Sequence, residues 1–325
     1  IKSSAASDVY KRQILIEGLW FEGFSPKEKN HGGALYITYS TGNVNLKNLN
    51  FKKCIVVSSN SDDPKRGSNG GAIYFNNFIE PISFNIDNCT FDSCSAKEGG
   101  AIYINNSNAD AGKNINIKKS TFTNNYAAVN GGGICARIGN TIRIEDCLFH
   151  ANAASDTDLI GNGGAIQLHQ QNKVELISCT FCKNTATNKG SAIFGNGNKE
   201  KPNLINIKNT VIADNYASRQ NNGRFALDAD NIGEHCIFTL TDCIIANNKN
   251  AKNNIADMNL YNSSSNNTIK NSIVNGSYHS KTTADTTNGK GRYKEYLTNE
   301  QLETLLQSRG VKDISTVSYT HLRAH

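Results

Sequence analysis

The chain has 325 residues, of which 38% are hydrophobic and 19% charged, with a formal net charge of +6 and a mean hydropathy of −0.48. The basic residues are spread along the chain without a cluster, so the composition argues against a nucleic-acid partner. The low apolar fraction suits a thin rod, which exposes much surface per residue, better than one large globular core.

The two ends of the chain break its internal pattern abruptly. Residues 1–13 and 317–325 look like translated adapter sequence from a sequencing library, so we set both segments aside when interpreting the fold. A signal peptide or membrane anchor would then lie in missing terminal sequence.

A short phrase recurs through the first two thirds of the chain: two small residues, a further small residue and an aliphatic one. Its copies lie about 30 residues apart, and repetition at roughly 20–50 residues is typical of stacked-repeat proteins. We expect the glycine pairs at tight corners that need a positive φ. The copies are Gly32-Gly33-Ala34-Leu35, Gly70-Gly71-Ala72-Ile73, Gly99-Gly100-Ala101-Ile102, Gly131-Gly132-Gly133-Ile134, Gly163-Gly164-Ala165-Ile166 and Gly190-Ser191-Ala192-Ile193.

A second phrase follows the first by about 20 residues and predicts the type of repeat. It is anchored on a bulky apolar residue, with apolar residues also seven, five and two positions earlier, as in Ile142, Ile144 and Cys147 before Phe149. Alternation at period two predicts a strand with one buried face. The anchors are Phe21, Phe51, Phe91, Phe122, Phe149, Phe181, Ile212, Ile245 and Val274, which predicts about nine rungs.

These phrases predict an all-β, single-stranded, right-handed parallel β-helix, a pectin-lyase-like solenoid, over residues 14–277. Such rungs cannot bury their apolar face alone but can do so by stacking in parallel at about 4.8 Å. The hand is an expectation from the chirality rule for parallel crossovers and from family precedent. Three residues after the anchors, we expect an inward ladder of amide side chains at Asn125, Asn152, Asn184, Asn215 and Asn248.

The pattern changes after the last predicted rung. Residues 278–297 are polar and are expected to be loose, and a short helix is predicted at 298–310 from Thr298 as N-cap and Gly310 past its end. We expect this helix to cover the exposed last rung; the alternative is that it begins a linker.

The cysteines and histidines give no clear chemical motif. Four of the nine cysteines share the column two before the anchor, which indicates buried thiols that pack as small apolar groups. Disulfides between Cys54 and Cys94 or between Cys147 and Cys179 stay open as an alternative, as does a zinc site. The histidines, His169 among them, fall at unrelated repeat positions and are expected on the surface or in loops, so no cofactor and no metal site is predicted.

Acidic residues that could support catalysis do not recur on neighbouring rungs. Asp62 with Asp63, Asp156 with Asp158, and Asp228 with Asp230 are the candidates, and none lies beside a histidine or arginine in a recognisable motif. Glycoside hydrolysis needs a pair of carboxylates. No catalytic residue is therefore predicted, and solvated loop acids are the simpler interpretation.

One outward-facing row is patterned. Tyr36, Tyr74 and Tyr103 occupy the same position on three consecutive rungs, and we expect them to stack on the outside of the sheet. Such a row can serve as a binding face for a glycan or a protein, or it can simply stiffen the sheet.

The pairing of Gly-Gly-Ala-Ile with Phe-x-x-Asn, as in Phe122-Thr123-Asn124-Asn125 and Phe149-His150-Ala151-Asn152, resembles the repeat of the polymorphic outer-membrane proteins of chlamydiae and of related surface proteins of protists such as trichomonads. The resemblance implies a β-helix at the cell surface or secreted, often adhesive, whose partner is a glycan or protein surface ligand. It favours a non-enzymatic protein; a polysaccharide lyase or glycoside hydrolase on the same scaffold is the alternative.

Overall fold

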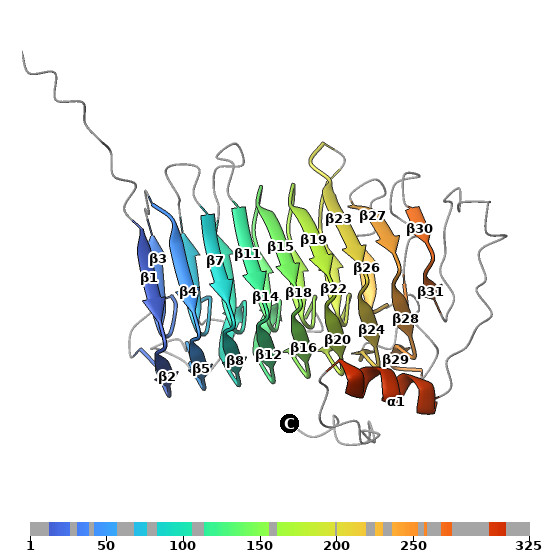
Figure 1. The fold of residues 1–325 in the computed structure, drawn as a ribbon, viewed down its shortest axis with the longest axis horizontal. Coiled ribbons are helices and arrows are strands. Elements are labelled where there is room, and N and C mark those ends of the chain that lie inside the picture. The colour runs from blue at the N-terminus through green and yellow to red at the C-terminus, as the bar shows by residue number, and fades with distance from the viewer. Residues whose placement is uncertain are drawn as a thin grey trace, which may run out of the picture.

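Parallel strands from successive repeats lie side by side along a rod in the computed structural model (Figure 1). The structure describes residues 13–26, 31–38, 42–56, 68–76, 83–105, 114–155, 161–198, 200–218, 225–229, 236–252, 257–258, 268–274 and 299–309. All of the strand pairs are parallel, so the predicted all-β solenoid is confirmed.

Each coil of the solenoid passes through four sheets, which we name A, B, D and C in the order in which the chain visits them. Sheet A contains β1 (Ile14–Glu17), β4 (Val44–Lys47), β7 (Ser83–Asp87), β11 (Asn114–Lys118), β15 (Thr141–Glu145), β19 (Lys173–Ile177), β23 (Asn203–Lys208), β27 (Cys236–Thr241) and β30 (Thr268–Lys270). Sheet B contains β2 (Trp20–Glu22), β5 (Asn50–Lys52), β8 (Thr90–Asp92), β12 (Thr121–Thr123), β16 (Leu148–His150), β20 (Thr180–Cys182), β24 (Val211–Ala213), β28 (Ile244–Ala246) and β31 (Ile273–Val274).

Sheets C and D are shorter. Sheet C contains β3 (Leu35–Thr38), β6 (Ile73–Asn76), β10 (Ile102–Asn105), β14 (Ile134–Ala136), β18 (Ile166–Leu168), β22 (Ile193–Gly195) and β26 (Leu227–Ala229). Sheet D contains β9 (Ser95–Glu98), β13 (Tyr126–Asn130), β17 (Ala153–Ala154), β21 (Thr185–Ala186), β25 (Tyr216–Ala217) and β29 (Lys249–Asn250). Within the described residues, the predicted count of nine rungs holds in sheets A and B, whereas about six turns carry a strand in sheet D.

The first six anchor residues of sheet B, the phenylalanines from Phe21 to Phe181, form a continuous aromatic stack along the rod. Neighbouring rings are nearly parallel, with centroids 4.9 Å apart between Phe51 and Phe91 and 4.6 Å apart between Phe149 and Phe181. This separation matches the spacing of parallel strands, so each ring within the stack contacts a phenylalanine on both sides. In coils two to eight, the sheet A residues that lie seven and five positions before each anchor are also buried.

The amide column forms the inward ladder at the corner after sheet B. Asn125, Asn152, Asn184, Asn215 and Asn248 are all fully buried. Each of the first four donates from Nδ2 to Oδ1 of the next, over 2.8–2.9 Å.

Asp257 takes the place of the next amide at the end of this ladder. Asn248 donates to its Oδ1 from both the backbone nitrogen (3.0 Å) and Nδ2 (2.7 Å). Burial raises the pKa of Asp257 to about 8, and the two hydrogen bonds offset this only in part. The ladder thus ends on a carboxyl group that is held protonated at neutral pH.

In coils two to eight, two corners are made by single non-glycine residues with positive φ, at positions where the first coil has Gly18 and Gly23. One precedes the cysteine column, as at Asp146 (φ 52°), and the other precedes the amide ladder, as at Ala151 (φ 54°). Asn, Asp, Lys and Ser fill most of these positions. Left-handed corners were predicted at the glycine pairs, and these two corners were not predicted.

The glycine pairs meet two different requirements. The first glycine, such as Gly99 (φ 63°), adopts the left-handed conformation. The second glycine needs no positive φ, but a Cβ on Gly100 would lie 2.2 Å from the carbonyl oxygen of Gly132 in the next coil. Close stacking of the coils, rather than backbone torsion, therefore requires the second glycine.

All nine cysteines lie in the described part of the chain, are buried, and form no disulfide. The cysteines of the two columns donate weak hydrogen bonds to backbone carbonyls, as Cys179 does to Ile144 (3.5 Å). Burial raises the pKa of Cys179 to about 12. These thiols pack as small neutral groups, as the first of the alternatives predicted.

The short C-terminal helix is α1 (Asn299–Ser308), and it does not cover the last rung as expected. Leu306 packs against Cys182, Val211 and Ala213 on the outer side of sheet B, and Figure 1 shows α1 lying alongside the rod. Arg309 donates to the carbonyl and to Oδ1 of Asn209 over 3.3 and 3.1 Å. The apolar side chains that sheet B turns outward at β20 and β24 account for this placement.

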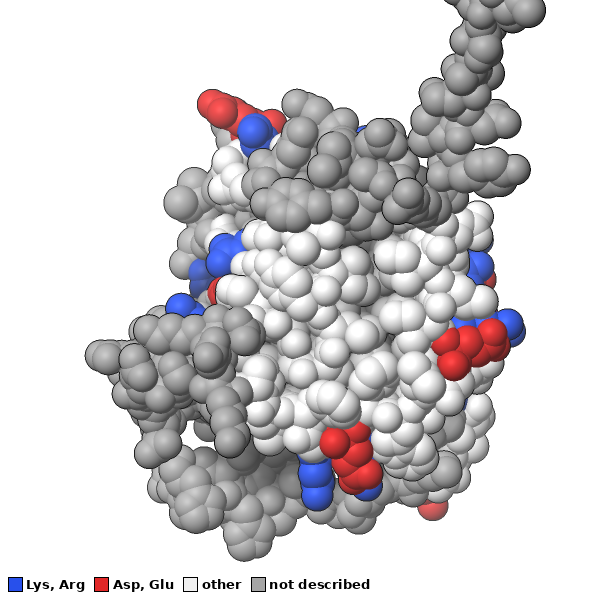
Figure 2. All heavy atoms as spheres, turned by 90° about the vertical axis from the view of Figure 1, so that its left-hand side faces the viewer, with Lys and Arg blue, Asp and Glu red and all other residues white. Residues whose placement is uncertain are grey.

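The first coil presents an apolar end face. Figure 2 looks onto this end of the rod, where the described charged side chains lie at the rim and the centre is uncharged. The exposed large apolar side chains of the coil are Ile14, Leu15, Leu19, Trp20, Phe24 and Tyr36.

Candidate functional site

The outward side chains of sheet C form a column in register along the rod. Most of them are shielded from solvent. Its members are Tyr36, Tyr74, Tyr103, Cys135, Gln167, Phe194 and Asp228. Tyr36 is 50% exposed, whereas each of the others is at most 5% exposed. This side of the solenoid therefore holds polar and ionisable groups out of water.

The predicted tyrosine stack is present, but it is not the accessible platform that was expected. Ring centroids of Tyr36 and Tyr74 are 5.2 Å apart, and those of Tyr74 and Tyr103 are 5.3 Å apart. His31 stacks on Tyr74 at 4.3 Å, and the Arg137 guanidinium lies 5.8 Å from the Tyr103 ring centroid. Because side chains from neighbouring corners cover the inner two rings, only Tyr36 remains open to a partner.

Beside this stack, the buried Glu98 forms an ion pair with the partly exposed Arg137. Glu98, the last residue of β9, is 6% exposed, and its Oε2 accepts from Arg137 Nη2 over 2.9 Å. Its Oε1 accepts from Asn130 Nδ2 over 2.8 Å. Arg137 also donates from Nε to the hydroxyl of Tyr103 at 2.5 Å. The carboxylate is thereby held in one orientation against the outer face of sheet C.

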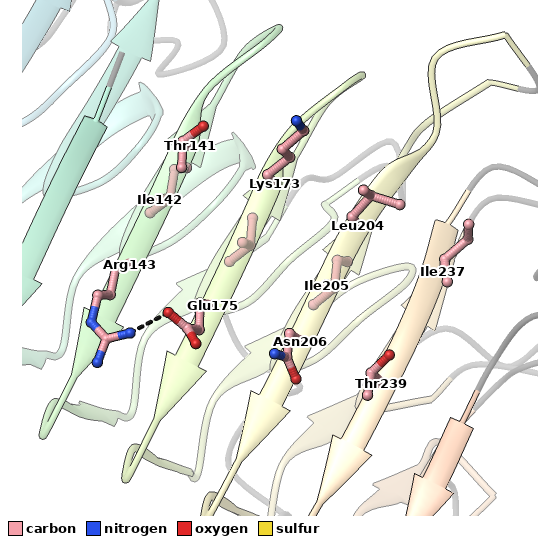
Figure 3. Close-up of a pocket in the computed structure, with 11 residues that line it drawn as sticks. Thr141, Ile142, Arg143, Lys173, Glu175, Leu204, Ile205, Asn206, Ile237 and Thr239 are labelled. Atoms are coloured by element: carbon pink, nitrogen blue, oxygen red, sulfur yellow. Dashed lines mark hydrogen bonds and ion pairs between the residues drawn. The ribbon is translucent and has the colours of Figure 1, made fainter. Parts of the chain in front are cut away.

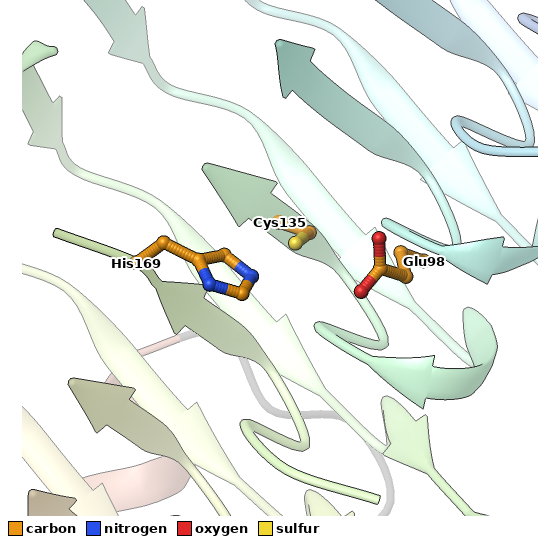
Figure 4. A group of neighbouring side chains, drawn as sticks. All are labelled: Glu98, Cys135 and His169. Atoms are coloured by element: carbon orange, nitrogen blue, oxygen red, sulfur yellow. The ribbon is translucent and has the colours of Figure 1, made fainter. Parts of the chain in front are cut away.

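Cys135 and His169 complete a cluster with Glu98. The three residues offer a sulfur, an imidazole nitrogen and a carboxylate oxygen that all lie within 4.8 Å of one another. Figure 4 shows the imidazole and the carboxylate approaching Cys135 from opposite sides. His169 follows β18 directly, and its backbone N–H donates to Ala136 over 2.9 Å, which fixes the start of this segment.

The buried surroundings set the charge states of this cluster. Burial, and to a smaller extent the nearby Arg137 charge, lower the pKa of His169 to about 4. Burial raises the pKa of the Cys135 thiol well above its usual range. At neutral pH the imidazole is therefore uncharged and the thiol protonated, which is not the thiolate–imidazolium state of a cysteine nucleophile.

His169 lies in the segment after β18, as expected of a loop histidine, but it is partly buried and lies beside two other potential ligand residues, which was not predicted. Its neighbours Glu98 and Cys135 occupy different positions within their repeats, on two preceding coils. No fixed sequence spacing relates the three, so only the register of sheet C against the sheet D corner brings them together.

The outer face of sheet A carries a shallow hollow of about 360 Å³ (Figure 3). Arg143 and Glu175 are among its lining residues and form an ion pair, and Arg143 also pairs with Glu145 over 3.2 Å. Lys173, Leu204 and Asn206, from the next two coils, are also among its lining residues. The hollow is lined by both polar and apolar side chains and crosses the neighbouring strands β15, β19, β23 and β27 of sheet A.

The acidic residues considered for catalysis are not brought together in the part of the chain that the structure describes. Asp228 is fully buried in the sheet C column. Asp62, Asp63, Asp156, Asp158 and Asp230 lie outside the described residues. In the sheet A hollow, the lining residues supply one carboxylate, that of Glu175, which is bound by Arg143.

Comparison with known proteins matches the repeat itself. Residues 119–137 and 178–196 match the Chlamydia polymorphic membrane protein repeat. Each matched segment contains an anchor phenylalanine, a ladder asparagine and a glycine phrase, the three features that form the core, the corner and the tight turn. The chain resembles the polymorphic outer-membrane protein repeats.

A relative supports the same class. The probable autotransporter YfaL of Escherichia coli (strain K12) is 27% identical over 176 residues, which is 50% of this chain and 13% of that protein. No solved structure matches the chain. Within the described residues, no helix is both long and apolar enough to cross a membrane. The repeat and this relative indicate a surface-exposed β-helix protein.

Proposed function

We propose that this chain is the display portion of a non-enzymatic extracellular or cell-surface protein that binds glycans through the outer face of sheet A. The observation that carries the proposal is that this face is long, half-exposed and chemically repetitive. Nine parallel strands place their outward side chains in register along the rod.

The chemistry of this face suits a hydroxyl-rich polymer. Asn116 donates to Asn85 and Asn85 donates to Asn45, each over 2.9 Å, so a row of amides runs across three coils. The row continues in register to Arg143 and Glu175. These groups offer donors and acceptors at about the strand spacing of 4.8 Å.

Apolar side chains complete the surface. Leu204 is 41% exposed beside the Arg143–Glu175 pair. Exposed aliphatic carbon next to amide and charged groups can contact the less polar faces of sugar rings while the polar groups bind hydroxyls. Tyr36, the open end of the tyrosine stack, lies on a different sheet and contributes at most a separate contact.

The enzymatic alternative is less well supported by the geometry. Hydrolysis of a glycosidic bond uses two carboxylates, one of which must be able to transfer a proton. Among the residues that line the sheet A hollow, Glu175 is the one carboxylate, and it forms an ion pair with Arg143.

The test is binding to an array of polysaccharides and to glycan-coated cells. We expect the double variant Arg143→Ala/Asn206→Ala to bind at least about tenfold more weakly than the parent, which corresponds to about 1.4 kcal/mol. The matched control is Lys52→Ala/Glu22→Ala, which removes an exposed ion pair of 3.4 Å on sheet B.

Equal binding by both variants would contradict the assignment of this face. Binding to cells that survives enzymatic removal of their glycans would indicate a protein ligand instead. Release of reducing or unsaturated ends from pectin-type polymers would support the lyase or hydrolase alternative.

A further inference from the structure

We propose that Glu98, Cys135 and His169 form a Zn²⁺ site on the outer side of sheet C. The three residues supply one oxygen, one sulfur and one nitrogen ligand, which are the ligand types that zinc takes in proteins. The site is independent of the proposed glycan face, which lies on sheet A.

The distances between the three ligand atoms are close to those around a small metal ion. Their ligand atoms lie within 4.8 Å of one another. In a tetrahedral site with metal–ligand distances of roughly 2.0–2.3 Å, the ligand atoms lie about 3.5 Å apart. Side-chain rotations that move the groups by about 1 Å would close the cluster around an ion, with water as a fourth ligand.

Glu98 is already held as a ligand carboxylate usually is. Asn130 and Arg137 each bond to one of its oxygens over 2.8 and 2.9 Å. Such outer contacts orient ligands, and each carboxylate oxygen keeps a second lone pair for a metal. Release of the Cys135 proton on binding would leave Zn²⁺ balanced by one thiolate and one carboxylate.

His169 supplies a second, independent observation. Its Nε2 is buried and has no hydrogen-bond partner among the described residues. A buried imidazole nitrogen without a partner costs free energy unless something pairs with it. A metal ion bound within the cluster would give the ring a partner.

The same residues are poorly arranged for nucleophilic catalysis. Cys135 has no solvent exposure, so a substrate cannot reach its sulfur, whereas an ion needs only the space between three side chains. The ion would join residues from three successive coils. Zinc binding is therefore expected to stabilise the solenoid, because the ligands are brought together only in the folded chain.

The test uses the purified chain under reducing conditions, with Zn²⁺ followed by calorimetry and Co²⁺ followed by absorbance. We expect one ion per chain, a thiolate-to-cobalt band in the near ultraviolet, and a higher melting temperature with Zn²⁺. Cys135→Ser should abolish the band, and His169→Gln should weaken Zn²⁺ binding by about tenfold or more.

Cys182→Ser is the matched control, because Cys182 is equally buried but packs under α1 on sheet B. This variant should keep the band and the stabilisation by Zn²⁺. Circular dichroism shows whether each variant is folded, and His169→Gln gives a second measurement if Cys135→Ser does not fold. Absence of the cobalt band in the parent, or its persistence in folded Cys135→Ser, would overturn the proposal.

Discussion

Truncation of one amide in the middle of the ladder is the sharpest test of how the corner after sheet B is stabilised. Asn152 donates from Nδ2 to the carbonyl of Phe122 and to Oδ1 of Asn184, each over 2.9 Å. Its Oδ1 accepts from the backbone nitrogen and from Nδ2 of Asn125, over 3.2 and 2.9 Å. Asn152→Ala removes all four bonds from a fully buried position.

The loss should be large because the former partners remain buried. The N–H of Asn125 is left without its acceptor, and the Phe122 carbonyl loses a donor. Each buried polar group that loses its partner costs about 1–3 kcal/mol, so we expect Asn152→Ala to lower the free energy of unfolding by about 2–4 kcal/mol.

The assay is urea unfolding of Asn152→Ala beside Asn116→Ala. Asn116 is a half-exposed amide on sheet A that donates one hydrogen bond to Asn85, so its loss should cost about 0.5 kcal/mol. With a slope of about 3 kcal/mol/M, the ladder variant should unfold about 1 M earlier in urea than the control. Equal midpoints for the two variants would refute the ladder as a source of stability.

Four further results are expected. Ala151→Gly should raise the melting temperature, because alanine with φ 54° carries a left-handed penalty of about 1 kcal/mol that glycine lacks. Asp257→Asn should leave stability unchanged near pH 4 and raise it at pH 8, because the folded pKa of about 8 lies above the ordinary 3.8 and stability falls as pH rises between them. Gly100→Ala should prevent stable folding, since its Cβ would lie 2.2 Å from a carbonyl oxygen of the next coil; a melting temperature like the parent's would contradict this. Tyr103→Ser should lower the melting temperature and Tyr36→Ser should not, as thermal unfolding of both would show.

Much of the fold could be predicted because local backbone geometry controls it. In an extended strand successive side chains point to opposite faces, so the spacing of Phe122, Phe149 and Phe181 against their apolar neighbours is enough to place them inside. The same register puts Asn125 and Asn152 three residues later at a corner, where only stacked neighbours can pair with their amides.

The corners were harder to predict. Positive φ was predicted at the glycine pairs, where the first glycine has it, but residues such as Asp146 and Ala151 also adopt it. A single residue with a Cβ can be held in this conformation when both adjoining strands are fixed by their neighbours in the stack. That constraint comes from the packed coils. The type of residue at such a position therefore indicates a positive φ only weakly.

The sequence by itself determined the inward half of this protein: the period-two strands, the stacked anchors, the amide ladder and the solenoid that they require. Only the tertiary structure decided the outward half. It covers Tyr74 and Tyr103, lays α1 against sheet B, and brings His169 to Cys135 and Glu98. The physical reason is that inward positions repeat with the coil, whereas outward contacts join residues at different repeat positions on different coils, and no periodicity links such residues.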